Sequence, residues 1–252
     1  MAKLSAFGTA LNMGAGDIQV ETATLVGTIS NPGDIDFTIT CTGMVGTPLT
    51  LAITVANGNA SSVAATVRTF LTNDAAAAPV RALFEIGGAT DKVILTRKIP
   101  MATIVNLNMA SATGSATGLT TTALSAGTHA GETLAPVAQI SNIGGPSLSA
   151  DTEDVTTHDS AGAWEEHVAT ILRTGEVSLD IVYDPAESTH DASTGIISMM
   201  ESKTLVGFSV VFPTPVTWSF AAYVTGFEPS APHDGALTAT VAMKITGAPI
   251  LV

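Results

Sequence analysis

Carboxylates recur in one stretch of this sequence at a spacing that gathers them on one side of a β-strand. From Glu176 to Asp184 the odd-numbered positions are apolar, and the even-numbered ones are acidic or polar apart from Val182. Side chains alternate across a strand, so one face can be buried while the other meets water. The exposed face would carry Glu176, Asp180 and Asp184, and it would repel an anionic molecule.

Other groups capable of chemistry are present, but none has the spacing of a known site. The candidates for metal binding or acid–base work are His158 with Asp159, His167, and His190 with Asp191. Neighbouring carboxylates such as Glu165 and Glu166 point to opposite sides of a strand and form no dyad. The sequence has no nucleophile elbow, dinucleotide-binding, phosphate-binding or zinc-protease motif. We predict no catalytic residue, no metal site and no cofactor, and interpret these histidines as members of solvated loops.

Charge is distributed unevenly over the 252 residues, whose formal net charge is −13. From Thr128 onward there are fifteen acidic residues against three basic ones, whereas the part before it has seven against six. Such an acidic half is unsuited to gripping a phosphate backbone, which needs clustered Lys and Arg.

Composition also bounds the fold and the compartment. The apolar fraction of 46% allows a substantial core, and an aromatic fraction of 5% favours thin sheets with many turns. The lone Cys41 excludes an internal disulfide, and its place in an alternating segment predicts burial. The first residues lack the apolar core of a signal peptide, and no stretch has membrane-spanning length. We expect synthesis and folding in a cytoplasm.

Residues 19–127 read as a small α+β domain. Asp34–Thr40 and Leu49–Val55 alternate strictly around a turn-forming segment, which predicts a hairpin. A helix should follow, with Asn59 or Ser61 as its cap, Asn73 and Asp74 at its end, and a buried face of Val63, Val67, Phe70 and Leu71. We predict further strands at 91–96 and 104–107. The uncharged segment Ala110–Gly131 reads as a linker or as an edge segment without a packing pattern.

Residues 128–252 predict a mainly β domain with one helix. The expected strands are 136–143, 147–157, 175–184, 204–212, 216–227 and 236–246, and the helix covers 196–201 with Ser188 or Asp191 as its cap. Trp218 should join Phe220 and Val224 in the core. The segment Thr157–Thr174 is longer than a hairpin turn requires, so we predict a functional loop. Trp164 in that loop suggests an interface anchor.

Several runs in this half resemble a known family in their order and spacing. They are Val137–Ser149, Asp154–Thr156, Gly175–Pro185, His190, Phe220–Phe227, Leu237–Val241 and Ile245–Pro249. Together they resemble the major tail-tube proteins of long, non-contractile-tailed bacteriophages, which are related to contractile-tail tubes and to the type VI secretion tube protein. The likeness covers about half of the chain. The opening Phe7–Leu11 is similar to the start of such proteins.

The resemblance implies a tail-tube fold that is mainly β, a β-sandwich able to form a barrel, built from residues 1–18 and 128–252. Residues 19–127 would then be an inserted accessory domain on the tube exterior, since alternating strands followed by a capped helix resemble modules on phage tail proteins. The implied function is structural rather than enzymatic. Copies would self-assemble into stacked hexameric rings, and the resulting hollow tube would pass genomic DNA without binding it specifically.

The same resemblance assigns roles to residues and partners. Glu176, Asp180 and Asp184 would face the bore. The segment with Asp159, Trp164, Glu165, Glu166 and His167 would contact the next ring. The implied partners are other copies of the chain and the tail tip, tape-measure and tail terminator proteins. The location is the virion tail after assembly in the bacterial host cytoplasm.

Two other classes of function remain open. In a tail-tip or adhesin-type binding protein, residues 19–127 would recognise a ligand, although their near-neutral charge and lack of clustered aromatics do not favour one. A β-sandwich hydrolase would need two carboxylates across a cleft, and nothing in the sequence converges them. Rings or tubes of purified protein, dispersed monomers, or turnover of sugars would separate the three.

Overall fold

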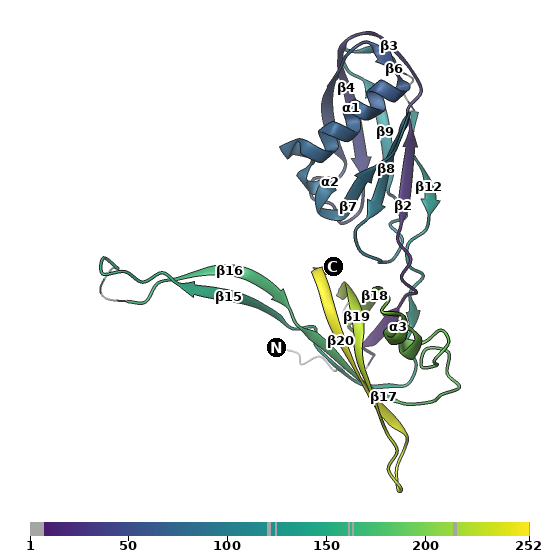
Figure 1. Ribbon diagram of the computed structural model, residues 1–252, viewed down its shortest axis with the longest axis vertical. Coiled ribbons are helices and arrows are strands. Elements are labelled where there is room, and N and C mark those ends of the chain that lie inside the picture. Colours follow the sequence, from purple (N-terminus) through teal and green to yellow (C-terminus); the bar gives the residue numbers. More distant parts are fainter. Residues whose placement is uncertain are drawn as a thin grey trace. The chain divides into compact units, whose positions relative to one another are not determined.

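The computed structural model describes residues 8–119, 122–123, 125–160, 162, 164–213 and 216–251 (Figure 1). Strands account for 50% of the structure and helices for 13%, so the fold is mainly β as predicted. The chain forms two compact units: unit 1 comprises Met1–Met13 and Ala135–Val252, and unit 2 comprises Gly14–Leu134. Phe7, part of the resembling N-terminal run, lies outside the described residues. Among the described helices none is long and apolar enough to cross a membrane.

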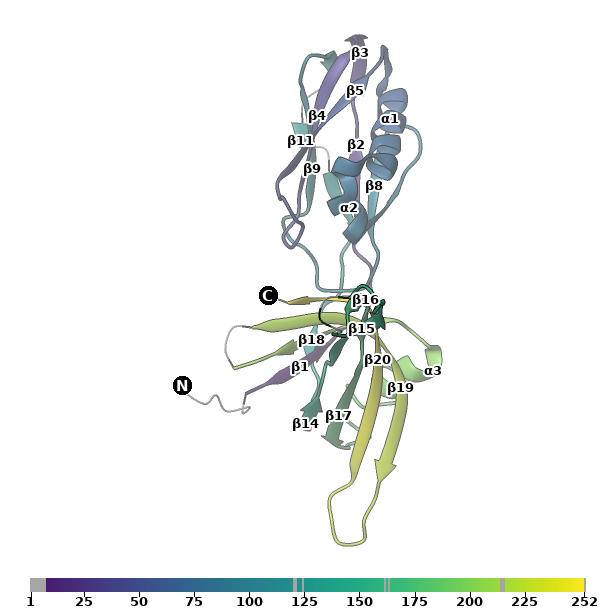
Figure 2. The same ribbon diagram turned by 90° about the vertical axis from the view of Figure 1, so that its left-hand side faces the viewer.

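Unit 1 is built on a seven-stranded antiparallel sheet with the strand order β13-β1-β18-β19-β20-β17-β14. In that order the strands are β13 (Ala135–Pro136), β1 (Ala10–Met13), β18 (Val206–Val211), β19 (Thr217–Ser230), β20 (Thr238–Leu251), β17 (Glu176–Val182) and β14 (Ile140–Gly144). Figure 2 shows β14, β17, β20 and β19 side by side. Five of the six predicted strands thus meet in one sheet.

The core of unit 1 covers one face of this sheet. Val177, Leu179 and Ile181 of β17 are buried, and they lie opposite buried residues of β20. Helix α3 (Ile196–Ser202) covers the same face through Ile196 and Met199. The alternation predicted for β17 is therefore confirmed. Trp218 is only half-buried, edge-on against Phe212 with ring centroids 6.0 Å apart.

The segment before α3 differs from the sequence prediction in two details. Gly195, rather than Ser188 or Asp191, is the N-cap. The Asp191 carboxylate instead accepts hydrogen bonds from the backbone N–H groups of Ser193, Thr194 and Gly195, which shapes the preceding turn.

His190 is buried, so its interpretation as part of a solvated loop was wrong. Its Nδ1 accepts a hydrogen bond of 3.3 Å from the Asp184 N–H, and its Nε2 lies 2.9 Å from the Ala138 carbonyl oxygen. The first contact makes Nδ1 the acceptor, so Nε2 carries the proton and donates to Ala138. The imidazole ties the segment before β14 to the end of β17.

A separate antiparallel hairpin of β15 (Leu148–Asp154) and β16 (His167–Thr174) completes unit 1 (Figure 1). The predicted loop over Thr157–Thr174 is wrong in its second half, which is strand. Both strands are exposed on both faces. Burial therefore imposes no alternation of apolar and polar residues on their sequences. The connection between the strands is closed by a hydrogen bond of 2.9 Å from the Val155 N–H to the Glu166 carbonyl.

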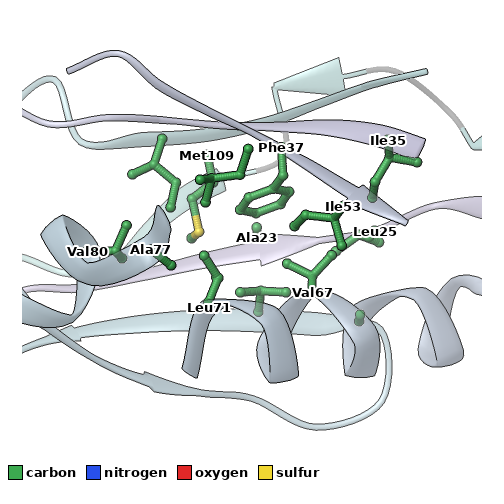
Figure 3. Packing of buried hydrophobic residues seen from close by; sticks show 14 of the residues in the cluster. Ala23, Leu25, Ile35, Phe37, Ile53, Val67, Leu71, Ala77, Val80 and Met109 are labelled. Carbon is green, nitrogen blue, oxygen red and sulfur yellow. The ribbon is translucent and has the colours of Figure 1, made fainter. Parts of the chain in front are cut away.

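Unit 2 contains the predicted hairpin and helix. Strands β4 (Gly33–Thr40) and β5 (Leu49–Val55) pair in register, and α1 (Ala60–Asn73) follows. The Asn59 side chain caps α1 by accepting from the Ser62 N–H at 3.1 Å. Figure 3 shows Val67 and Leu71 of α1 packing against the sheet residues Phe37, Ile53 and Met109. Cys41 is buried as predicted.

The described strands of unit 2 form three sheets, with the orders β10-β3-β6, β11-β9-β4-β5 and β12-β2-β8-β7. The elements of unit 2 not yet named are β2 (Val20–Thr24), β3 (Gly27–Asn31), β6 (Gly58–Asn59), the 3-10 helix η1 (Ala75–Ala77), α2 (Ala78–Leu83), β7 (Phe84–Gly87), β8 (Lys92–Arg97), β9 (Asn108–Thr113), β10 (Thr117–Leu119), β11 (Thr122–Ala123) and β12 (Ser125–His129).

One strand prediction for unit 2 is wrong. Ile104–Leu107 is a turn, in which the Leu107 N–H donates to the Ile104 carbonyl at 3.2 Å. Of the two alternatives for Ala110–Gly131, the linker is wrong, because the segment contributes strands, and β9 pairs with both β4 and β11. The edge alternative agrees with β10, β11 and β12, each of which stands at one end of its sheet. The predicted strand at 91–96 is confirmed as β8.

The first and last residues of unit 2 are tied together by Glu132. Its carboxylate accepts hydrogen bonds of 2.6 Å from the backbone N–H groups of Ala15 and Gly16. A Cβ atom on Gly14 would lie 2.2 Å from the carboxyl carbon of Glu132. A side chain at position 14 would therefore displace the Glu132 carboxylate from these hydrogen bonds.

Candidate functional site

The exposed face of the seven-stranded sheet carries all the charge of the strands. Within the described strands of this sheet four residues are charged, namely Glu176, Asp180, Glu228 and Lys244. Asp180 lies opposite Thr240, which lies opposite Glu228, and Glu176 lies opposite Lys244. Directly opposed residues share a face, so three carboxylates and one ammonium group lie together on the side opposite the core. We call these four residues the charged face.

Asp180 is held across three strands. Its Oδ2 accepts from the Asn142 amide of β14 at 3.1 Å, and its Oδ1 accepts from the Thr240 hydroxyl of β20 at 2.8 Å. These two hydrogen bonds, the one from Asn142 first, lower the pKa of the Asp180 carboxyl. The side chain is therefore a fixed negative charge at neutral pH.

Glu176 and Asp184 have different surroundings. The Lys244 Nζ lies 3.4 Å from Glu176 Oε1 in an exposed ion pair, which offsets part of the Glu176 charge. Asp184 lies beyond the end of β17 and is half-buried. Its Oδ1 accepts from the Ala186 N–H at 2.9 Å, so it shapes a turn. The structure thus brings Glu176 and Asp180 onto one strand face and leaves Asp184 outside the strand.

Glu228 belongs to the charged face but was missed from the sequence. The predicted strand ended at Phe227, whereas β19 continues to Ser230. A register shift between Val224 and Gly226 changes the phase of β19. No local pattern in the sequence marks this shift, so Glu228 could not be assigned to the face from its spacing.

The residues predicted for ring contact lie at the tip of the β15–β16 hairpin. Trp164 has 77% of its surface exposed, and Asp159, Glu165, Glu166 and His167 are also exposed. His167 Nε2 lies 3.6 Å from Glu165 Oε2.

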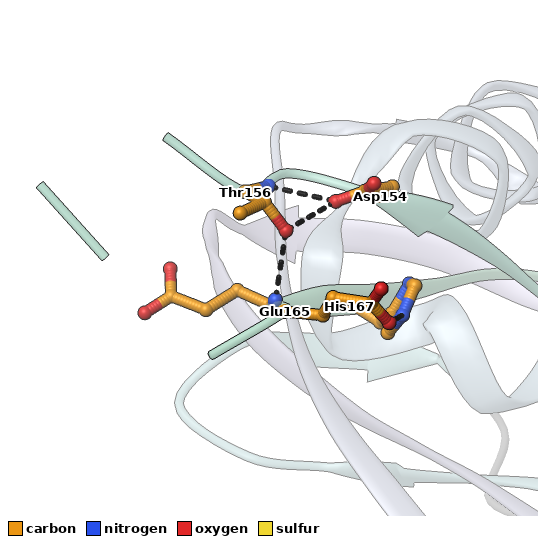
Figure 4. Close-up of polar contacts among 5 residues, drawn as sticks. Asp154, Thr156, Glu165 and His167 are labelled. Atoms are coloured by element: carbon orange, nitrogen blue, oxygen red, sulfur yellow. Dashed lines mark hydrogen bonds and ion pairs between the residues drawn. The ribbon is translucent and has the colours of Figure 1, made fainter. Parts of the chain in front are cut away.

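Thr156 connects the two arms of the hairpin near this tip (Figure 4). Its hydroxyl accepts from the Glu166 N–H at 3.0 Å and donates to Asp154 Oδ1 at 2.5 Å. The same Asp154 oxygen accepts from the Thr156 N–H at 2.9 Å. These bonds, the one from the hydroxyl first, lower the pKa of Asp154.

The base of the hairpin borders a cavity of about 610 Å³. Its walls come from both hairpin strands and from the last part of β20: Leu148, Ser149, Ala150, Leu172, Arg173, Thr174, Gly247, Ala248 and Pro249. Arg173 Nη2 and Nε lie 2.6 Å and 2.7 Å from Asp151 Oδ2. The hydrogen bond with Arg173 lowers the pKa of Asp151.

The histidines singled out from the sequence do not converge. His190 is enclosed in unit 1, His158 is exposed, and His167 lies on the hairpin. Within the described part of the chain, no three His, Cys, Asp or Glu side chains are grouped so that they could hold a metal ion.

Comparison with known proteins gives one family match. Residues 121–252 match the family model described as "Lambda phage tail tube protein, TTP". No curated protein matches the chain.

Several solved structures are similar to part of the chain. A chain in the virion of the native gene transfer agent particle is 21% identical with a TM-score of 0.41, covering 47% of this chain and 88% of that one. A chain in the tail of the empty gene transfer agent particle, refined with C6 symmetry, has the same identity and TM-score over 47% and 86%. A chain of the anti-feeding prophage baseplate is 10% identical with a TM-score of 0.36, over 48% and 84%.

Proposed function

The chain belongs to the lambda phage tail tube protein family, and we propose that it self-assembles into stacked hexameric rings that form a hollow tail tube for genomic DNA. The observation that carries this proposal is the charged face. One side of the seven-stranded sheet packs against the core, and the other exposes three carboxylates and one ammonium group on its described strands.

The charged face suits the wall of a DNA channel. DNA carries two negative charges per base pair, and proteins that bind it neutralise its phosphates with Lys and Arg. A wall with an excess of carboxylates does the opposite, so DNA passes it without being held. Asp180 suits this role best, because its position and its charge are both fixed by Asn142 and Thr240.

The sheet also has what ring formation requires. In its strand order β14 and β13 stand at the two ends. An edge strand presents unpaired N–H and C=O groups, and a closed ring of identical subunits pairs such edges with each other. We propose six copies per ring, the number that the family resemblance implies.

Unit 2 is proposed as the accessory domain on the tube exterior. It is inserted between β1 and β13, and none of the seven strands of the unit 1 sheet belongs to it. In the virion tail the tube would meet the tail tip, tape-measure and tail terminator proteins, after assembly in the host cytoplasm.

Electron microscopy of the purified, concentrated protein tests the proposal. Rings or tubes with a central channel are expected. Dispersed monomers would contradict it and favour the tail-tip or adhesin-type alternative.

The role of the charged face is tested with the triple variant Glu176→Gln, Asp180→Asn, Glu228→Gln. These substitutions keep the size of the side chains and remove all three carboxylates of the charged face. Lys244 is then its one charged residue, so the net charge of the face changes from negative to positive. We expect tubes to form, to retain DNA, and to deliver less of it, most strongly at low salt. Glu201→Gln, on the exposed side of α3, is the matched control. Normal delivery by the triple variant would contradict the bore assignment.

A further inference from the structure

We propose that Trp164, at the hairpin tip of one copy, inserts into the cavity at the hairpin base of a second copy. The inference rests on the proposed function, since it requires copies to assemble, and it specifies the contact by which rings would stack.

The hairpin exposes apolar side chains that need a partner. Leu172 is 84% exposed and Ile171 58%, and Leu148 and Val168 are about half exposed. An isolated two-stranded hairpin is only marginally stable in water. Apolar surface clustered on one exposed element marks an interaction site. The hairpin is therefore expected to be covered in the assembled state.

The cavity offers an aromatic ring a mainly apolar lining with one cation. Leu148, Ala150, Leu172 and Pro249 supply apolar surface, and Arg173 stands among them. A guanidinium group within about 6 Å of an indole face attracts it. Trp is also one of the residue types enriched among the buried anchors of interfaces.

The tip cannot fill the cavity of its own copy. The cavity lies at the Leu148 end of β15, whereas Trp164 lies past the other end of this seven-residue strand. At roughly 3.3 Å per residue, the strand alone separates them by about 20 Å. The occupant that the geometry allows is the tip of another copy.

The two ends of the hairpin differ in charge. The tip carries Asp159, Glu165 and Glu166, with His167 beside Glu165. At the base, Arg173 is paired with Asp151, so the pair has no net charge, but the Arg173 side chain is 61% exposed. Its exposed guanidinium group is therefore open to a carboxylate of an approaching tip, which would orient the contact.

This contact joins two different surfaces. Such a heterologous interface leaves one free tip and one free cavity in every pair, so it can repeat along an axis without closing. That property fits the stacking of rings, whereas edge-strand pairing fits their closure.

Disulfide trapping tests the contact. Glu165→Cys and Leu172→Cys are introduced together, which keeps Trp164 and the other residues of the cavity lining unchanged. Polymerised protein under oxidation should give a ladder of linked chains on non-reducing gels. The control pair Asp234→Cys and Leu172→Cys uses another exposed acidic position and should give none. The native Cys41 is buried. Polymers of the first pair without a ladder would overturn the inference.

Fluorescence provides a second test that does not depend on the cysteine variants. Trp218→Phe leaves Trp164 as the reporter, and its emission should shift to the blue and become less accessible to acrylamide on polymerisation. Adding Leu172→Arg should abolish the shift. Unchanged Trp164 emission in tubes would overturn the inference and leave the proposed function standing. If the wild-type protein forms no polymer, the proposed function fails first.

Discussion

At the scale of single residues, the Asp180 side chain both links three strands of the sheet and places a negative charge on its exposed face. Its two hydrogen bonds join β14, β17 and β20, and they also keep the carboxylate ionised. A neutral amide at this position has only one acceptor oxygen, so it could not accept both hydrogen bonds in the same way.

This arrangement predicts a pH-dependent contribution to stability. The pKa of Asp180 lies below its ordinary value of 3.8 in the folded protein. A carboxyl with a depressed folded-state pKa stabilises the fold above its unfolded-state pKa, and this contribution disappears as the pH falls through the folded-state value. Asp180→Asn should therefore be less stable than the wild type at neutral pH, with the difference narrowing below pH 3.8.

Urea unfolding at a series of pH values, followed by tryptophan fluorescence, measures this difference. Both tryptophans of the sequence lie in unit 1, so the signal reports the unit that contains Asp180. A difference that stays constant through the acid range would contradict the assigned role.

At the scale of elements, His190 holds together segments that are distant in the sequence. The imidazole accepts from the Asp184 N–H after β17 and donates to the Ala138 carbonyl before β14. We predict that His190→Ala lowers the free energy of unfolding by about 2–4 kcal/mol, because a buried side chain is removed and two half-buried backbone groups lose their partner.

The matched control is His233→Ala. Its side chain is 97% exposed, so the change should stay within about 0.5 kcal/mol. Equal unfolding midpoints for the two variants in urea would show that the buried contacts of His190 are not needed for stability.

Long runs of strictly alternating residues were predicted correctly as strands. The alternation of β17 and of the β4–β5 hairpin reflects burial on one side. Strand β16 was missed because its residues show no alternation, whereas its equally exposed partner β15 was predicted. Strand β9 was missed because Ala110, Ser111 and Ala112 carry little local signal, and its neighbours β4 and β11 decide its conformation.

The residues of the charged face were predicted only in part. Glu176 and Asp180 were assigned to one strand face from their spacing, and the structure places them there. Asp184 was grouped with them, although its carboxylate caps a turn beyond the strand. Glu228 was not grouped with them, because β19 and β20 are paired through a register shift that no local pattern announces.

At the scale of the whole molecule, the two units depend on each other little for their internal packing. Each has its own apolar core. Unit 2 leaves the sheet after Met13 and returns at Ala135, and these two residues are cross-strand partners. Its removal should therefore leave strand ends that face each other.

We predict that unit 1 folds and assembles alone when residues 14–134 are replaced by Asn-Gly. This dipeptide favours the tight turn that joins adjacent antiparallel strands, here β1 and β13. By electron microscopy its tubes should have the wild-type bore and a smaller outer diameter. A changed bore would contradict the exterior placement of unit 2, and loss of folding would contradict the independence of unit 1.

The pairing of Met13 with Ala135 also bears on how such a gene can change. A coding segment whose two ends meet at one point can be lost, duplicated or exchanged for another by recombination at its borders. With unit 2 on the tube exterior, as proposed, selection could change the outer surface of a virus particle without altering the tube wall, and related viruses should differ most in what they carry at this junction.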